Sequence, residues 1–218
     1  MSDALAEQLY NFYAAGVYPV LAQNDPEYQR SLVTAGLGWQ GLRDVPAESR
    51  NSFQQAMKMQ AWLGARKVTE ARSLDPDTVR VKVLTGPLTL YRVAQSGAVT
   101  PPGIWWFSEK VAERCREEAG SDPQKRLDWL RNVLAVCFNW SRFDRIERLA
   151  LHSGEKLPAV LGRGLSMPHY KIDPSVDRTV PALPPDYWQK KGEMLLGGEL
   201  QIVLPWIPVR RVSSTESL

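Results

Sequence analysis

Two stretches in the middle of the chain combine an arginine or a serine with aromatic residues. Arg92 lies inside the apolar run "LTLYRV" at 88–93, where its side chain either reaches solvent or enters a cleft. A guanidinium in a cleft is a natural partner for a phosphate or pyrophosphate, which it binds through two parallel hydrogen bonds. Downstream, "IWWF" at 104–107 is followed by Ser108. Its rings could present a flat face to a planar ligand, although packing in the core is the commoner fate of tryptophan.

A third stretch, "GGELQIVLPW" at 197–206, places one acid and one amide in a strand pattern that begins with two glycines. Glycines at such a position let another group approach the backbone closely. Glu199 and Gln201 are two residues apart and therefore share one face of the strand, whereas Leu200, Ile202 and Leu204 share the other. The stretch is either an ordinary edge strand or the floor of a binding cleft.

Several common chemistries have no support in the sequence. The chain contains no GxGxxG, phosphate-loop or GxSxG pattern. His152 and His169 are the only histidines, and no cysteine or carboxylate is spaced with them as a zinc site requires, so we expect no metal cofactor. His169 in "MPHY" is more typical of an ordinary loop histidine than of a catalytic base.

The composition is that of a globular protein that binds no large polyanion. The 218 residues are 44% hydrophobic and 23% charged, with a net charge of +3, and no run of lysine and arginine is long enough for nucleic-acid binding. Cys115 and Cys137 are expected as reduced, buried thiols. The sequence shows no membrane span and no cleaved signal peptide, which predicts a cytoplasmic protein or one secreted by a route without such a signal.

The first 78 residues are predicted to form a helical annex. Leu5 and Leu9 follow helical spacing after a cap at Ser2 or Asp3, and the pattern ends at Gly16. Two further helices are expected, one after "NDP" at 24–26 and one from about 46 to 73. None of the three carries an obvious site residue.

Residues 79–212 have strand character, and the predicted class is α+β. Strands are expected at 79–84, 88–93, 104–107, 145–152, in "ELQIVLP" and in "VRRV", with helices after Ser108 and after Asp122. Residues 153–192 hold six prolines and many turn signals, which favours a functional loop or lid. A polar tail is expected from 213 to 218.

The three stretches together resemble the motifs of the ADP-ribosyltransferase superfamily, whose members consume NAD. Those folds have an arginine strand often written "YR", an aromatic or serine-rich middle strand, and a late strand with E-x-E or Q-x-E before "VLLP"-like residues. The resemblance covers roughly residues 87–212 and rests on short motifs. It implies a split β-sheet core, with the NAD-binding domain at 79–212 following the annex at 1–78.

The same resemblance implies roles for individual residues. Arg92 would hold the pyrophosphate, with Tyr91 beside it, and Trp105, Trp106 or Phe107 would face a ring of NAD next to Ser108. Gln201 would take the catalytic position and bond the ribose hydroxyls, while Glu199 would orient a water. Because a nearby carboxylate favours an oxocarbenium-like transition state, Glu199 is also an alternative active carboxylate. For Ser108 a helix cap is the commoner role.

The glutamine at the last motif position departs from the transferring members of the superfamily. It is similar to secreted NAD glycohydrolase toxins, in which glutamine occupies this place, and so favours hydrolysis of NAD by a bacterial toxin or effector domain. Two alternatives remain: a mono-ADP-ribosyltransferase of a macromolecular target, and a non-catalytic binding or interaction protein. The expected partners are NAD and either a protein target or an immunity protein, without nucleic acid or membrane.

Overall fold

A computed structural model of the protein describes residues 2–14, 73–94, 105–138, 144–170, 192–204 and 212–215. Within these ranges the helices are α1 (Ser2–Ala14), α5 (Glu109–Ala119) and α6 (Pro123–Val133). Its strands are β1 (Arg80–Thr85), β2 (Leu88–Ala94), β3 (Trp105–Ser108), β4 (Arg145–Leu151), β5 (Lys156–Arg163), β6 (Met167–Pro168), β7 (Met194–Leu195), β8 (Leu200–Val203) and β9 (Val212–Thr215). The expected helices between 24 and 73 lie outside the described residues.

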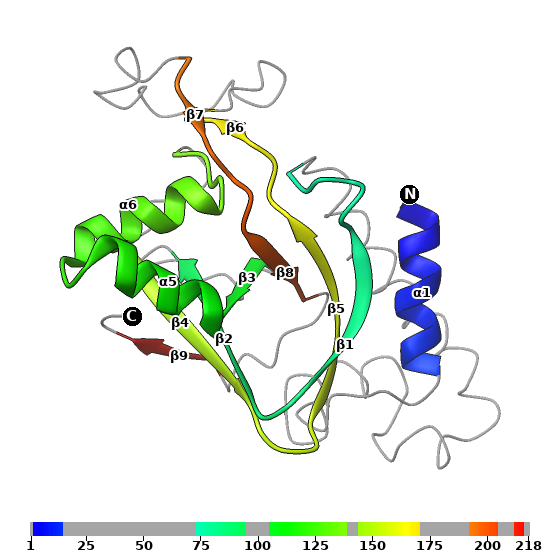
Figure 1. Ribbon diagram of the computed structural model, residues 1–218. Coiled ribbons are helices and arrows are strands. Elements are labelled where there is room, and N and C mark those ends of the chain that lie inside the picture. The colour runs from blue at the N-terminus through cyan, green and yellow to red at the C-terminus, as the bar shows by residue number, and fades with distance from the viewer. Residues whose placement is uncertain are drawn as a thin grey trace, which may run out of the picture.

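Seven strands form one antiparallel sheet in the order β1-β5-β8-β3-β2-β4-β9 (Figure 1). β6 and β7 form a separate two-stranded ribbon, which continues from the ends of β5 and β8. Helices and a mostly antiparallel sheet make the class α+β, as the sequence predicted. The predicted strands at 79–84, 88–93, 104–107 and 145–152 correspond to β1, β2, β3 and β4.

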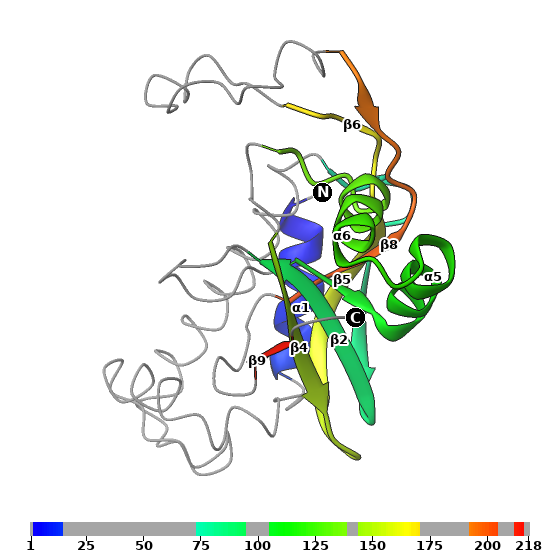
Figure 2. The ribbon, with the colours of Figure 1, turned by 90° about the vertical axis from the view of Figure 1, so that its left-hand side faces the viewer.

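The sheet has two sides with different coverings. Tyr91 and Phe107 pack with Val111, Cys115 and Leu130 of the two helices, so we call their side the helix side. Figure 2 shows α5 and α6 together on this one side of the sheet. On the opposite side lies a second cluster, which includes Leu90, Trp106, Leu149, Leu161 and Ile202.

Local signals explain where α5 and α6 begin. The Asp122 carboxylate accepts hydrogen bonds from the backbone N–H groups of Gln124 and Lys125, at 2.9 and 3.2 Å, and Pro123 occupies the first helical position. Ser108 occupies the N-cap position of α5, as predicted, but its side chain makes no capping hydrogen bond. The predicted helices at both places are confirmed.

The prediction of a structureless connection at 153–192 is wrong for its first part, because β5 runs through it from Lys156 to Arg163. Six consecutive residues of β5 are buried, so the strand lacks the alternation of apolar and polar residues that reveals a half-buried strand. Pro158 is tolerated because it pairs with Val83 of β1 before the pairing with β8 begins at Val160.

The two ends of the chain also pack on the sheet. Leu5 and Leu9 of α1 are buried against Val160 of β5 and Val203 of β8, which confirms the helical spacing read at the N-terminus. β9 pairs with β4 from Val212 to Thr215, so residues 213–215, expected as the start of a polar tail, belong to a strand. Within the described part of the chain, no helix is long and apolar enough to cross a membrane.

Candidate functional site

The three strands that carry the motif stretches are neighbours in the sheet. β3 lies between the other two, since it pairs with β2 through Tyr91 and Phe107 and with β8 through Trp106 and Ile202. Directly paired residues of antiparallel strands point to the same side. The register therefore fixes which motif residues can meet.

Arg92 and Gln201 do not meet, although the sequence led us to expect them in one cleft. Arg92 follows Tyr91 and so points to the opposite side, where its guanidinium lies over the Trp106 ring at 5.7 Å. Gln201 precedes Ile202 and so points to the helix side. Because successive side chains of a strand point to opposite sides, the thickness of the sheet lies between Arg92 and Gln201.

Arg92 is engaged in a buried ion pair instead of facing a cleft. Its Nε donates to the Glu147 carboxylate at 2.5 Å, and the two side chains are only 10% and 6% exposed. Arg145 donates to the other oxygen of the same carboxylate at 2.5 Å. Burial lowers the pKa of Arg92, and the hydrogen bond from Arg92 to Glu147 opposes that shift. This arrangement ties β2 to β4.

The aromatic residues expected to face NAD are part of the core. Trp106 and Phe107 are each 1% exposed, one on each side of the sheet, so neither presents a free face. Trp105 packs against the cluster that holds α1. Tyr91 is also buried, and its hydroxyl donates to Glu109 at 2.6 Å. Ser108 is half-buried at the start of α5.

The segment from Gly197 to Gln201 completes the end of α6. The last carbonyls of a helix lack intrahelical partners. Here the Gly197 N–H donates to the Asn132 carbonyl at 3.0 Å, the Glu199 N–H to that of Val133 at 3.4 Å, and the Gln201 Nε2 to that of Leu134 at 2.7 Å. Gln201 is 6% exposed, so its amide serves the fold by holding α6 on β8.

The two glycines of this segment differ in what surrounds them. Both have positive φ, +69° at Gly197 and +89° at Gly198. A Cβ at Gly197 would lie 2.6 Å from the Leu165 carbonyl oxygen, whereas one at Gly198 would meet nothing within 4 Å. The group that approaches the backbone closely at Gly197 is therefore another part of the chain, the Leu165 carbonyl. Beside Gly198 the space is open.

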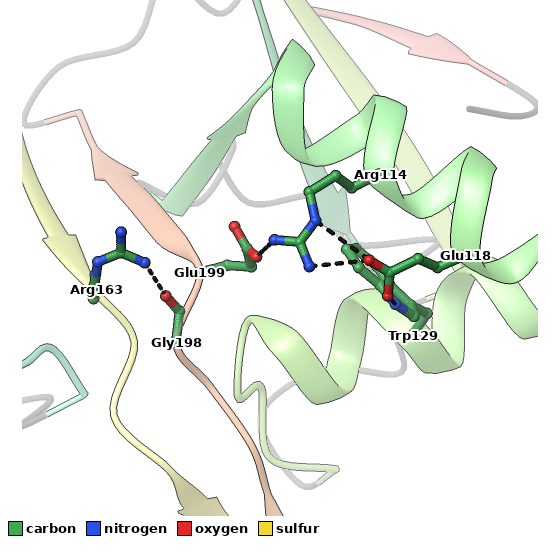
Figure 3. A network of polar contacts seen from close by, with 6 residues as sticks. All are labelled: Arg114, Glu118, Trp129, Arg163, Gly198 and Glu199. Atoms are coloured by element: carbon green, nitrogen blue, oxygen red, sulfur yellow. Dashed lines mark hydrogen bonds and ion pairs between the residues drawn. The ribbon is translucent and has the colours of Figure 1, made fainter.

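Glu199 directly follows Gly198, and its side chain faces α5 (Figure 3). Its side chain is 15% exposed, and its carboxylate accepts a hydrogen bond from Arg114, whose side chain is 43% exposed. Arg114 also bonds to Glu118 through two nitrogens, at 3.0 and 3.3 Å. On the other flank, Arg163 donates to the Gly198 carbonyl at 2.8 Å. We call Glu199, Arg114, Glu118 and Trp129 the rim network.

Trp129 of α6 completes the rim network. Its Nε1 donates to Glu118 at 2.9 Å, and its ring lies under the Arg114 guanidinium at 5.7 Å. The hydrogen bond from Trp129, together with that from Arg114, lowers the pKa of Glu118. The hydrogen bond to Glu118 and the charge of Glu199 raise the pKa of Arg114. Both shifts favour the charged forms of Arg114 and Glu118, and the rim network contains two carboxylates and one guanidinium.

Sequence reasoning missed Arg114, Glu118 and Trp129. The spacing of Arg114 and Glu118 by four residues on a predicted helix was a signal that the two could pair. Nothing in the sequence indicated that α5 would bring Arg114 to Glu199, since 85 residues separate them. Within the described ranges, no three His, Cys, Asp or Glu side chains are grouped as a metal site needs.

Comparison with known proteins gives no family. No protein-family model and no curated protein matches the sequence. One matching solved structure is Rhs1-CT in complex with its cognate immunity protein RhsI1, at 14% identity and a TM-score of 0.34, over 64% of this chain and 78% of that one. Another is Tse6 in complex with Tsi6, at 13% identity and a TM-score of 0.27, over 91% of this chain and 98% of that one. Neither likeness assigns a family or a function to this chain.

Proposed function

We propose that this protein consumes NAD, that it does so as a glycohydrolase, and that Glu199 is the active carboxylate. The observation that carries the proposal is the adjacency of β2, β3 and β8, the strands of the three motif stretches. In the superfamily that the motifs resemble, the corresponding strands build the NAD site. Glu199, directly before β8, is a motif residue that combines a charge with partial exposure.

The chemistry follows from the position of a carboxylate at the rim. In NAD hydrolysis the bond between the ribose C1′ and the nicotinamide nitrogen breaks, and its electron pair leaves with nicotinamide. A positive charge then develops on the ribose, which a carboxylate stabilises. Water forms the new bond to C1′ and releases one proton, giving ADP-ribose and nicotinamide. Glu199 stabilises the charge and orients the water, while Gln201 fixes β8 against α6.

The test is incubation of the purified protein with labelled NAD, with and without a cell lysate, while nicotinamide and ADP-ribose are followed. Free ADP-ribose without labelled protein supports hydrolysis. Label on lysate proteins would instead support the mono-ADP-ribosyltransferase. Absence of both turnover and NAD binding would leave the non-catalytic interaction protein.

The variant that tests the site is Glu199→Gln, which keeps the shape and removes the charge. We expect kcat/KM to fall by roughly 10²- to 10³-fold, as for loss of a group that acts in the transition state. Glu113→Gln is the matched control, because Glu113 is exposed on the facing helix α5. Full activity of the Glu199→Gln variant would contradict the assignment of Glu199.

A further inference from the structure

The Arg114 guanidinium occupies a position that is built for a planar cation. The carboxylates of Glu118 and Glu199 bind it from two elements, and the Trp129 ring lies beside it at 5.7 Å. Carboxylates and an indole face are the groups that recognise flat or quaternary cations in proteins. The rim network therefore has the chemistry of a cation site whose present occupant is a side chain of the same chain.

This occupant is held at a position that water can reach. The Arg114 side chain is 43% exposed, and that of Glu118 is 50% exposed, so water already competes for their hydrogen bonds. Arginine also has a long, flexible stem that can carry its head into solvent. When the guanidinium leaves, the carboxylates of Glu118 and Glu199 remain without this cation. Glu199 directly follows Gly198, where an added Cβ would meet nothing within 4 Å.

We infer that the rim network binds a planar cationic ring, the pyridinium of NAD, and that Arg114 holds this site in the absence of substrate. The pyridinium takes the place of the guanidinium over Trp129, which brings the bond to be broken next to Glu199. The identity of the cation rests on the proposed function. The preference of the site for a planar cation does not, since binding can be measured without turnover.

The test uses Arg114→Ala and two ring compounds of nearly the same shape, 1-methylnicotinamide, which is cationic, and nicotinamide, which is neutral. We expect calorimetry to show at least tenfold tighter binding of 1-methylnicotinamide to Arg114→Ala than to the unmodified protein, with no gain for nicotinamide. Guanidinium ion should compete with the cationic ring in the variant. Adding Glu199→Gln to Arg114→Ala should abolish the gain.

Arg116→Ala is the matched control. Arg116 lies two residues further along α5, is 36% exposed and pairs with Glu109, away from Glu199. Its removal should leave the binding of both rings unchanged. Thermal unfolding of each variant verifies that the fold is intact.

Each outcome decides a different point. If NAD is hydrolysed but Arg114→Ala gains no affinity for the cation, or if its KM for NAD rises, the inference is wrong and the proposed function stands. If the cationic ring binds as expected but NAD is not hydrolysed, the proposed function fails and the cation site stands. If neither ring compound binds any variant and NAD is not hydrolysed, both are wrong.

Discussion

In the part of the chain that the structure describes, two arginine–glutamate pairs each join two separate elements, and they differ in their contact with water. Arg92 and Glu147 join β2 to β4 with side chains that are 10% and 6% exposed. Arg114 and Glu199 join α5 to the start of β8 with side chains that are 43% and 15% exposed. The first pair is closed to ligands, whereas the second lies at the surface, where we propose that a ligand replaces the guanidinium. Burial, more than residue type, therefore separates the structural pair from the candidate site.

The largest effect is expected from breaking the closed pair at its carboxylate. Glu147→Ala would leave both Arg92 and Arg145 without the carboxylate that they share. Removing one partner of a buried pair typically costs about 3–5 kcal/mol, because an uncompensated charge remains in the core. We expect this loss in the free energy of unfolding, measured by chemical denaturation.

Arg92→Ala should cost less than Glu147→Ala, because Arg145 still binds the carboxylate. This order is what a structural pair requires. If Arg92→Ala instead keeps full stability and loses NAD binding, the opposite side of the sheet is a ligand site after all, and the contrast between the two pairs disappears.

The next effect compares the two glycines that precede Glu199. Gly197→Ala would place a methyl group 2.6 Å from the Leu165 carbonyl oxygen at a φ of +69°, and we expect it to cost roughly 2–4 kcal/mol from the clash and the left-handed backbone. Gly198→Ala meets nothing within 4 Å and should cost only about 1 kcal/mol from its φ of +89°. Denaturation of both variants gives the difference. Equal losses would show that the space beside Gly198 is not open.

The local signals in the sequence predicted most of the described elements. Alternation predicted β1, capping residues predicted α5 and α6, and the glycine-led stretch predicted β8. β5 was not predicted because a strand buried on both sides shows no alternation of apolar and polar residues. Its proline and glycine were also typical of a loop.

The candidate site was predictable only in part. Glu199 was identified because it shares a strand with Gln201 and resembles a motif. The contact of Glu199 with Arg114 could not be predicted, because it depends on how α5 packs on the sheet. Arg92 was placed with Gln201 because short motifs do not carry the register between strands, and one residue of register reverses the side to which a side chain points.

The last prediction, and the one that decides most about the motif, concerns Gln201. Its Nε2 donates to the Leu134 carbonyl at 2.7 Å, so Gln201→Met should cost about 1–2 kcal/mol by leaving a buried carbonyl without this donor. The methionine has a similar volume and fills the same space.

If the only role of Gln201 is to hold α6 on β8, the Met variant should keep a measurable kcat below its unfolding temperature. Its KM for NAD should be nearly unchanged. If Gln201 bonds the ribose as the resemblance implies, the same variant should lose turnover by 100-fold or more at temperatures where it is fully folded. The ratio of kcat to the fraction folded therefore separates the two roles. A stable but inactive Gln201→Met variant would indicate that Gln201 is the catalytic residue and that Glu199 has a supporting role.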